Sequence, residues 1–335
     1  MKRRTLLKAG FICSAAAGLG LSRPNISHAA EALTLRFAHF LKAGHPGYIA
    51  AEQFAARVTE RTSGAIKFEI FPDNALGSPP EQAEKIRLGT VDMGLPTQGQ
   101  LHPYEPAFST ILMPFIFRNP QHAFRFLDGP GMKWLAPRAE KQGFYLLRHW
   151  DYGFRNMTNN VRPILAPDDV KGLKFRTPPE LPVQSAMEAL GAETVIIPFP
   201  ELFQALAAKT VDGQENPVPI IYANKFYEVQ KHLAITRHVY SSCIHTMSLS
   251  AWKKLSPIHQ TIFQEESIAA GNLMRKLTAE METDQISKIG AAGVQVTYPE
   301  LQPFRNKMRP AYKRIAEFAG EANVKTFLDL HLLAL

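Results

Sequence analysis

The chain has 335 residues, with 38 basic and 30 acidic side chains, a formal net charge of +8 and two cysteines. Five basic residues and no acidic residue fall within residues 1–29, so the rest of the chain carries 8 − 5 = +3. This mild charge, without a basic stripe interleaved with aromatic residues, argues against a nucleic-acid-binding protein. After residue 29 only Cys243 is left, so no internal disulfide is expected, and about 306 residues suffice for two domains of typical size.

Residues 1–29 are predicted to be a twin-arginine-like signal peptide. The segment KRRTLLK at 2–8 holds the paired arginines, and a modest apolar run follows from Ala9 to Leu21. Ser27-His28-Ala29 fits the small-residue rule for cleavage. Because the apolar run is shorter than the roughly 20 residues that span a bilayer, we expect export to the periplasm and cleavage, not an anchor.

Strands and helices are expected to alternate in the first half of the chain. Apolar periodicity predicts strands at 33–38, 66–71 and 91–95, and helices at 46–63 and about 79–88. This rhythm is typical of a parallel sheet with helices on both faces. His39 and Gln98 lie on loops after the strands, where each is either a ligand contact or a solvated loop residue.

The middle of the chain carries the strongest binding signal. A strand is predicted at 144–150, followed at once by a crossing to a second domain. Another strand, LKFR, ends at Arg176 because the prolines that follow cannot continue a sheet ladder. Ligands of open α/β sheets bind beyond such strand ends, and a guanidinium matches a carboxylate with two parallel hydrogen bonds. From spacing alone, Arg176 is either such a ligand contact or a member of a salt bridge.

The later elements are expected to complete the second domain and return to the first. We predict helices at 182–190 and near 200–209, a strand at 194–197, a strand and turn at 211–217, and a crossing back at 238–250. A helix over about 257–290 would be roughly 50 Å long at ~1.5 Å per residue, and could brace both domains.

Seven segments, in order, resemble the periplasmic solute-binding subunits of TRAP transporters (tripartite ATP-independent periplasmic carriers) of the dicarboxylate-binding type. They are LRFAHF at 35–40, SGAIKFEIFPDNALG at 63–77, IRLGTVDMG at 86–94, MPFIFRNPQHAF at 113–124, GFRNMTNNVRPI at 153–164, PDDVKGLKFRTPPE at 167–180 and VDGQENP at 211–217. The resemblance implies an α/β, two-domain periplasmic binding protein of the Venus-flytrap type, with discontinuous domains, hinge crossings and a long spine helix. We expect domain I at 31–152 plus 242–281, and domain II at 153–241 plus 282–335.

The resemblance also implies roles for individual residues. In the family, the arginine after the GLK strand, here Arg176, clamps the substrate carboxylate; Arg155 supports that carboxylate and Asn216 caps it. Glu215 either accepts hydrogen bonds from ligand hydroxyl groups or forms an ion pair with Arg155 or Arg176. The complete set of candidate ligand-binding residues is Arg176, Arg155, Asn216, Glu215, Gln98, His39, Asn159, Trp150 and Tyr222.

The expected function is delivery of a small organic acid to membrane-embedded TRAP permease subunits by a monomeric protein without enzymatic activity. No catalytic or nucleotide-binding motif occurs, and neither a cofactor nor a metal is predicted, although some members of the resembled family bind a metal with their solute. Four polar residues, Gln98, Gln100, Asn159 and Glu215, would suit a sugar acid (uronate or aldonate), which we favour. Four aromatic residues, Trp150, Tyr152, Phe40 and Tyr222, would suit an aromatic or branched 2-oxo acid. A dicarboxylic acid is a further alternative. A ligand-sensing partner of a membrane receptor kinase would share every motif.

Overall fold

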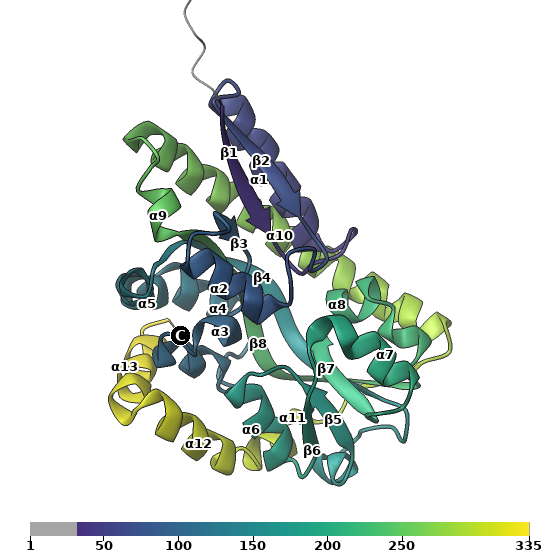
Figure 1. Ribbon diagram of the computed structural model, residues 1–335. Helices are drawn as coiled ribbons and strands as arrows, with labels where there is room; N and C mark the ends of the chain where they lie inside the picture. Colours follow the sequence, from purple (N-terminus) through teal and green to yellow (C-terminus); the bar gives the residue numbers. More distant parts are fainter. Residues whose placement is uncertain (1–31, 335) are drawn as a thin grey trace, which may run out of the picture. The chain divides into compact units, whose positions relative to one another are not determined.

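The computed structural model describes residues 32–334, which belong to one compact unit; the predicted signal peptide lies outside the described residues. Their strands form one sheet with the path β2-β1-β3-β8-β4-β7-β5-β6, and β9 pairs with β8 (Figure 1). The strands are β1 (Leu33–Ala38), β2 (Ile66–Phe71), β3 (Met93–Gly94), β4 (Phe144–Asn159), β5 (Lys174–Thr177), β6 (Glu193–Ile196), β7 (Gly213–Pro217), β8 (His232–Ser248) and β9 (Gln295–Thr297).

The strands fall into two groups, β1 to β3 and β5 to β7, and helices cover both groups. The α-helices are α1 (Pro46–Arg61), α2 (Pro79–Arg87), α3 (Gln98–Leu101), α4 (Pro120–Asp128), α5 (Pro130–Lys141), α6 (Leu181–Ala189), α7 (Leu202–Ala207), α8 (Val218–Ala223), α9 (Leu249–Trp252), α10 (Pro257–Ala291), α11 (Leu301–Asn306), α12 (Arg309–Ala319) and α13 (Glu321–Leu332). Short 3₁₀ turns are η1 (Pro106–Leu112), η2 (Pro167–Val170), η3 (Phe199–Glu201) and η4 (Phe226–Glu228). Within the described residues, none of these helices has the length and apolar character to cross a membrane.

The first group of strands, β1 to β3, confirms the predicted βαβ rhythm. β1 pairs in parallel with both β2 and β3, and its alternation buries Leu35 and Phe37 while Arg36 stays exposed. α1 begins as expected at Pro46, where the His45 Nδ1 atom accepts a hydrogen bond of 3.0 Å from the Gly47 backbone N–H. The apolar face of α1 then packs into the core on this sheet.

The second group of strands, β5 to β7, carries the loops around Arg176. β5 lies between β6 and β7 and runs parallel to both, while β7 runs antiparallel to β4. The predicted strand at 173–176 is therefore present with its bounds moved by one residue, to Lys174–Thr177. α6 packs on this group, together with α12 from the C-terminal part of the chain.

Two long antiparallel strands, β4 and β8, join the groups. The expectation that a strand ends near residue 150 is wrong, because β4 continues through 16 residues to Asn159 and pairs with β8 along its length. β8 likewise begins at His232, before the predicted 238. Register shifts interrupt the pairing at three places, one of them between Asp151 and Gly153, where Gly153 has φ 104°. Sequence periodicity breaks at such bulges, which is why the strand looked shorter.

α10 is the predicted long helix. It begins after Ser256, whose Oγ accepts a hydrogen bond of 3.3 Å from the His259 backbone N–H, and its 35 residues span roughly 52 Å at ~1.5 Å each. Figure 1 shows it running past α1, β4 and α8, all of which it contacts. At Gly271 the helix approaches Trp150 so closely that an added Cβ would lie 2.7 Å from the indole Cδ1.

Candidate ligand-binding site

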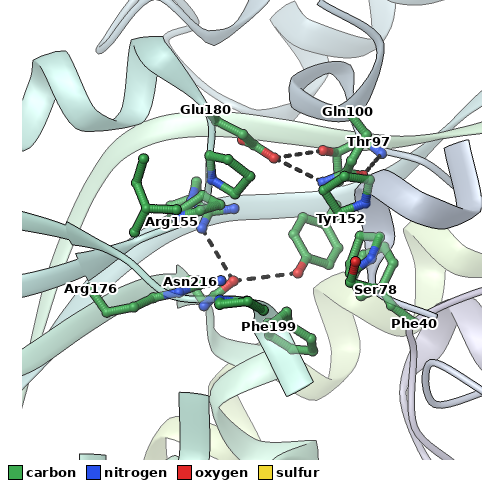
Figure 2. A pocket seen from close by; sticks show the side chains of 16 residues that line it. Phe40, Ser78, Thr97, Gln100, Tyr152, Arg155, Arg176, Glu180, Phe199 and Asn216 are labelled. Carbon is green, nitrogen blue, oxygen red and sulfur yellow. Dashed lines mark hydrogen bonds between the residues drawn. The ribbon is translucent and has the colours of Figure 1, made fainter. Parts of the chain in front are cut away.

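A cavity of about 110 Å³ lies where the two groups of strands face each other (Figure 2). Its lining from the second group includes Arg176 and the loop after β5, and its lining from the first group includes Phe40 and Thr97. Most of the wall is apolar, with the aromatic rings of Phe40, Tyr152 and Phe199 prominent. An apolar wall with a few convergent polar groups is the usual composition of a small-molecule site.

Arg176 enters this cavity from β5 and is 2% exposed. Its Nε donates a hydrogen bond of 2.9 Å to the Ile197 carbonyl oxygen, and its guanidinium lies 5.9 Å from the centroid of the Phe199 ring. Within residues 32–334 no carboxylate forms an ion pair with it. Burial lowers the pKa of Arg176 to about 10, which leaves it cationic at neutral pH. Arg176 therefore places a cation at the cavity wall with no directly bonded carboxylate among the described residues, although the charges of Glu215 and Glu180 act on it from a distance.

Arg155, from β4, is the second arginine of the cavity, and it is paired. Its Nε and Nη2 donate to the two carboxylate oxygens of Glu215, with 2.6 Å between Nη2 and Oε1. Burial alone would lower the pKa of Arg155, but the Glu215 carboxylate raises it overall. The ion-pair alternative for Glu215 is thus the observed one; Glu215 lies outside the cavity lining and holds Arg155 in place.

Asn216 lines the cavity beside Arg155 because β7 pairs with β4 at this point. Its Oδ1 accepts hydrogen bonds from Arg155 Nη2 at 3.3 Å and from the Tyr152 hydroxyl at 3.4 Å. Its Nδ2 donates to Gln214 Oε1 at 2.6 Å. The structure therefore brings together three predicted residues, Arg176, Arg155 and Asn216, with Tyr152 as a common neighbour.

Three further predicted residues have other partners and lie outside the cavity lining. Gln98 is fully buried and exchanges hydrogen bonds with Ser242, at 3.1 Å to its backbone N–H and 2.5 Å to its hydroxyl. His39 is buried with its ring 5.7 Å from that of Tyr48. Asn159 accepts hydrogen bonds from two backbone N–H groups of the following turn.

Trp150 and Tyr222 also lie away from this lining. Trp150 is fully buried, and its indole Nε1 donates a hydrogen bond of 3.0 Å to the Ser267 carbonyl oxygen in α10. Tyr222 stacks on Tyr227, with 5.5 Å between the ring centroids. Both side chains therefore serve packing between elements at these positions.

Sequence reasoning missed Glu180, which lines the cavity although it is only 2% exposed. It follows β5 by three residues, so the rule that pointed to Arg176, a polar side chain just beyond a strand end, could have found it. It also missed Thr97 and Phe199, for which no comparable signal exists. Among the described residues, no group of three or more His, Cys, Asp or Glu side chains could hold a metal ion.

The sequence profile of the bacterial extracellular solute-binding proteins, family 7, matches residues 37–318. The chain belongs to this family. Its relatives include the 2,3-diketo-L-gulonate-binding periplasmic protein of Escherichia coli (strain K12), 34% identical over 88% of each chain. The predicted resemblance to TRAP solute-binding subunits is confirmed by this family together with the solved TRAP solute-binding protein described next, and the protein is a solute-binding protein, not an enzyme.

Solved structures support the same assignment. The sugar acid binding protein of Advenella mimigardefordensis, in complex with galactonate, has a TM-score of 0.87 and 29% identity, covering 91% of this chain and 99% of that one. A TRAP periplasmic solute binding protein of Sulfurospirillum deleyianum with bound succinate has a TM-score of 0.83 and 29% identity, covering 89% and 99%. The predicted two-domain α/β fold with its long helix is confirmed; the exact domain boundaries stay a prediction.

Proposed function

We propose that this protein binds a small organic acid in the periplasm and delivers it to the membrane subunits of a TRAP transporter. The ligand carboxylate would lie against Arg176, with Arg155 and Asn216 on its other sides. The observation that carries this proposal is the guanidinium of Arg176, which is buried at the cavity wall without a carboxylate partner in the described chain. Burying an unpaired charge is costly, so a site of this kind is complementary to an anion.

The second arginine is prepared for the same ligand. Because Glu215 compensates the charge of Arg155 and fixes its geometry, Arg155 contributes oriented N–H groups rather than net charge. Because Glu215 pairs with Arg155, Arg176 is left as the cation of the lining that has no directly bonded carboxylate among the described residues. A carboxylate on the ligand would bond to it.

For the ligand class we propose a hydroxylated acid of the sugar-acid type. The relatives named above bind galactonate and 2,3-diketo-L-gulonate, and the lining contains the polar side chains of Ser78, Thr97 and Gln100, which are hydrogen-bonded to Glu81 or Glu180. A succinate-binding neighbour makes a dicarboxylic acid the main competitor. The aromatic rings of the wall would equally contact an aromatic or 2-oxo acid, so a ligand panel must contain all of these.

A thermal-shift panel of carboxylates, followed by calorimetry, tests the proposal. A ligand at a hundred times its Kd adds about 2.7 kcal/mol to the free energy of unfolding, which is easily detected. Arg176→Ala should then weaken binding by about 2–5 kcal/mol, which corresponds to roughly 30-fold to 4,000-fold in Kd. Arg118→Ala, which removes an exposed arginine, is the matched control and should bind normally. Undiminished binding by Arg176→Ala would show that the carboxylate lies elsewhere.

A further inference from the structure

Among residues 32–334, Glu180 is the one carboxylate in the cavity lining, and only one of its two oxygens has hydrogen-bond partners. Its Oε1 accepts hydrogen bonds from Thr97 Oγ1 and Gln100 Nε2, both at 3.0 Å (Figure 2). Its Oε2 is buried and has no hydrogen-bond partner among the described residues. An ionised carboxylate is an acceptor with capacity on both oxygens, so Oε2 can accept a hydrogen bond from a bound molecule.

The position of this carboxylate is fixed from the opposite side of the cavity. Glu180 follows β5 in the second group of strands, whereas Thr97 and Gln100 belong to the first. The side chain also lies directly over Gly99, where an added Cβ would be 1.8 Å from the Glu180 Cδ. The contact with the Gly99 backbone and the two donors on Oε1 therefore hold the carboxylate in place.

The charges of the lining then define the ligand. Arg155 is paired with Glu215, whereas Arg176 and Glu180 form no ion pair among the described residues and act on each other only across the lining. A ligand carboxylate against Arg176 would form an ion pair with it. A hydroxyl group elsewhere on the ligand could donate to Glu180 Oε2, while a second carboxylate near it would meet a like charge in a poorly solvated site.

We propose that Glu180 makes this protein selective for hydroxylated monocarboxylic acids over the corresponding dicarboxylic acids. The inference rests on the proposed function, because it presupposes that the acid occupies the cavity at Arg176. It goes further in assigning the discrimination between two ligand classes to one side chain. If Glu180 were protonated within the site, its carboxyl would offer an O–H donor and favour a second carboxylate on the ligand. The preference of the wild type for the hydroxy acid or for the diacid therefore shows whether Glu180 is ionised or protonated.

Two matched pairs of probes isolate this effect. D-erythronate and meso-tartrate differ only in a terminal CH₂OH or carboxylate, and galactonate and galactarate differ in the same way with a longer chain. Calorimetric titration of the wild type should show tighter binding of the hydroxy acid in whichever pair fits the cavity. Equal binding of both members, or tighter binding of the diacid, would overturn the inference while leaving the proposed function intact.

Glu180→Gln tests the side chain itself. The amide oxygen can still accept from Thr97 and Gln100, while the amide nitrogen replaces the free carboxylate oxygen with a donor. We expect affinity for the hydroxy acid to fall about tenfold and the preference over the diacid to shrink or reverse, since a hydrogen bond to a charged group contributes roughly a factor of ten or more. Glu193→Gln, which removes an exposed charge at the start of β6, is the control and should keep the wild-type ratio.

The outcomes separate the two ideas. If Arg176→Ala binds neither member of a pair, and the wild type prefers the hydroxy acid, both the proposed function and the role of Glu180 are supported. If Glu180→Gln keeps the wild-type ratio of affinities for the hydroxy acid and the diacid, while Arg176→Ala does not bind either acid, only the role of Glu180 is refuted. Failure of the wild type to bind any of the four acids would count against both. The wild-type ratio is informative even if the variant does not fold.

Discussion

Replacing Arg176 by methionine should separate binding from stability. Burial lowers the pKa of this guanidinium to about 10, so the folded state holds the proton less tightly than the unfolded chain does. For a base whose pKa is depressed on folding, the free-energy cost is complete below the folded pKa and is therefore present in full at neutral pH. At about 1.4 kcal/mol for each pH unit, this cost amounts to roughly 3 kcal/mol.

Arg176→Met removes this cost, but part of the resulting gain in stability is offset by a lost hydrogen bond. The Ile197 carbonyl oxygen loses its hydrogen bond from Arg176 Nε, which costs about 1–2 kcal/mol. The ligand-free Arg176→Met protein should therefore be more stable than the wild type by roughly 2 kcal/mol, although it no longer binds the acid. Urea denaturation without ligand measures the first effect, and the ligand-induced shift of Tm measures the second.

Arg155→Met provides the contrast, because it removes a partner from a buried ion pair. Glu215 would stay buried without its main counter-charge, and breaking such a pair costs about 3–5 kcal/mol. Substitution of the two arginines of the cavity is thus expected to change the free energy of unfolding in opposite directions. A ligand-free Arg176→Met protein that is less stable than the wild type by 1 kcal/mol or more would refute this reasoning and make Arg176 a structural residue.

Three further variants test the surrounding framework. Burial raises the pKa of Asp151 to about 7, so the free-energy cost of burying its ionised form is absent at low pH and grows as the pH rises. Asp151→Asn, which can still accept a hydrogen bond from the Tyr240 hydroxyl, should therefore be more stable than the wild type by up to roughly 4 kcal/mol at pH 8 but not at pH 4. An equal difference at both pH values in urea denaturation would contradict this prediction. Burial lowers the pKa of His245 to about 3, so between pH 6.5 and about 3 the unfolded chain binds a proton at this group that the folded protein does not. In this range the free energy of unfolding of the wild type should fall by about 1.4 kcal/mol per pH unit through this group, and His245→Gln should show a shallower loss of Tm on acidification. Gly271→Ala should cost about 1–3 kcal/mol by overpacking against Trp150, with a change in tryptophan fluorescence; an unchanged Tm and spectrum would show that α10 moves away freely.

Local patterns predicted the regular elements well and the long-range pairings poorly. β1 and β2 match their predicted bounds because each alternates apolar and polar residues without interruption. β4 was predicted too short because its pairing with β8 shifts register at three places, and each shift changes which face the next side chain occupies. The same effect explains why Trp150, predicted to face the ligand, lies in the core against α10.

The site shows the same division. The position of Arg176 at the end of a strand was predictable within ten residues of sequence, and the structure places its side chain in the cavity lining; its contact with a ligand stays a prediction. Glu180 stands in the same loop, but its partners Thr97 and Gln100 lie 83 and 80 residues away in the chain, so nothing local marked it as fixed in the cavity. The pairing of Arg155 with Glu215 was foreseen as one of two alternatives, and only the strand register between β4 and β7 decided it.

The paired course of β4 and β8 has a mechanical consequence for the cavity. A hydrogen-bonded ribbon between the two strand groups yields more easily to torsion than to separation, and torsion concentrates where the register is irregular. The last of these irregularities falls between Arg155 and Met157, and β7 is paired with β4 there through Asn156 and Asn216. Any twisting of the ribbon would therefore reorient Arg155 and Asn216 as a unit, so the proposed anion site and the angle between the strand groups are geometrically coupled.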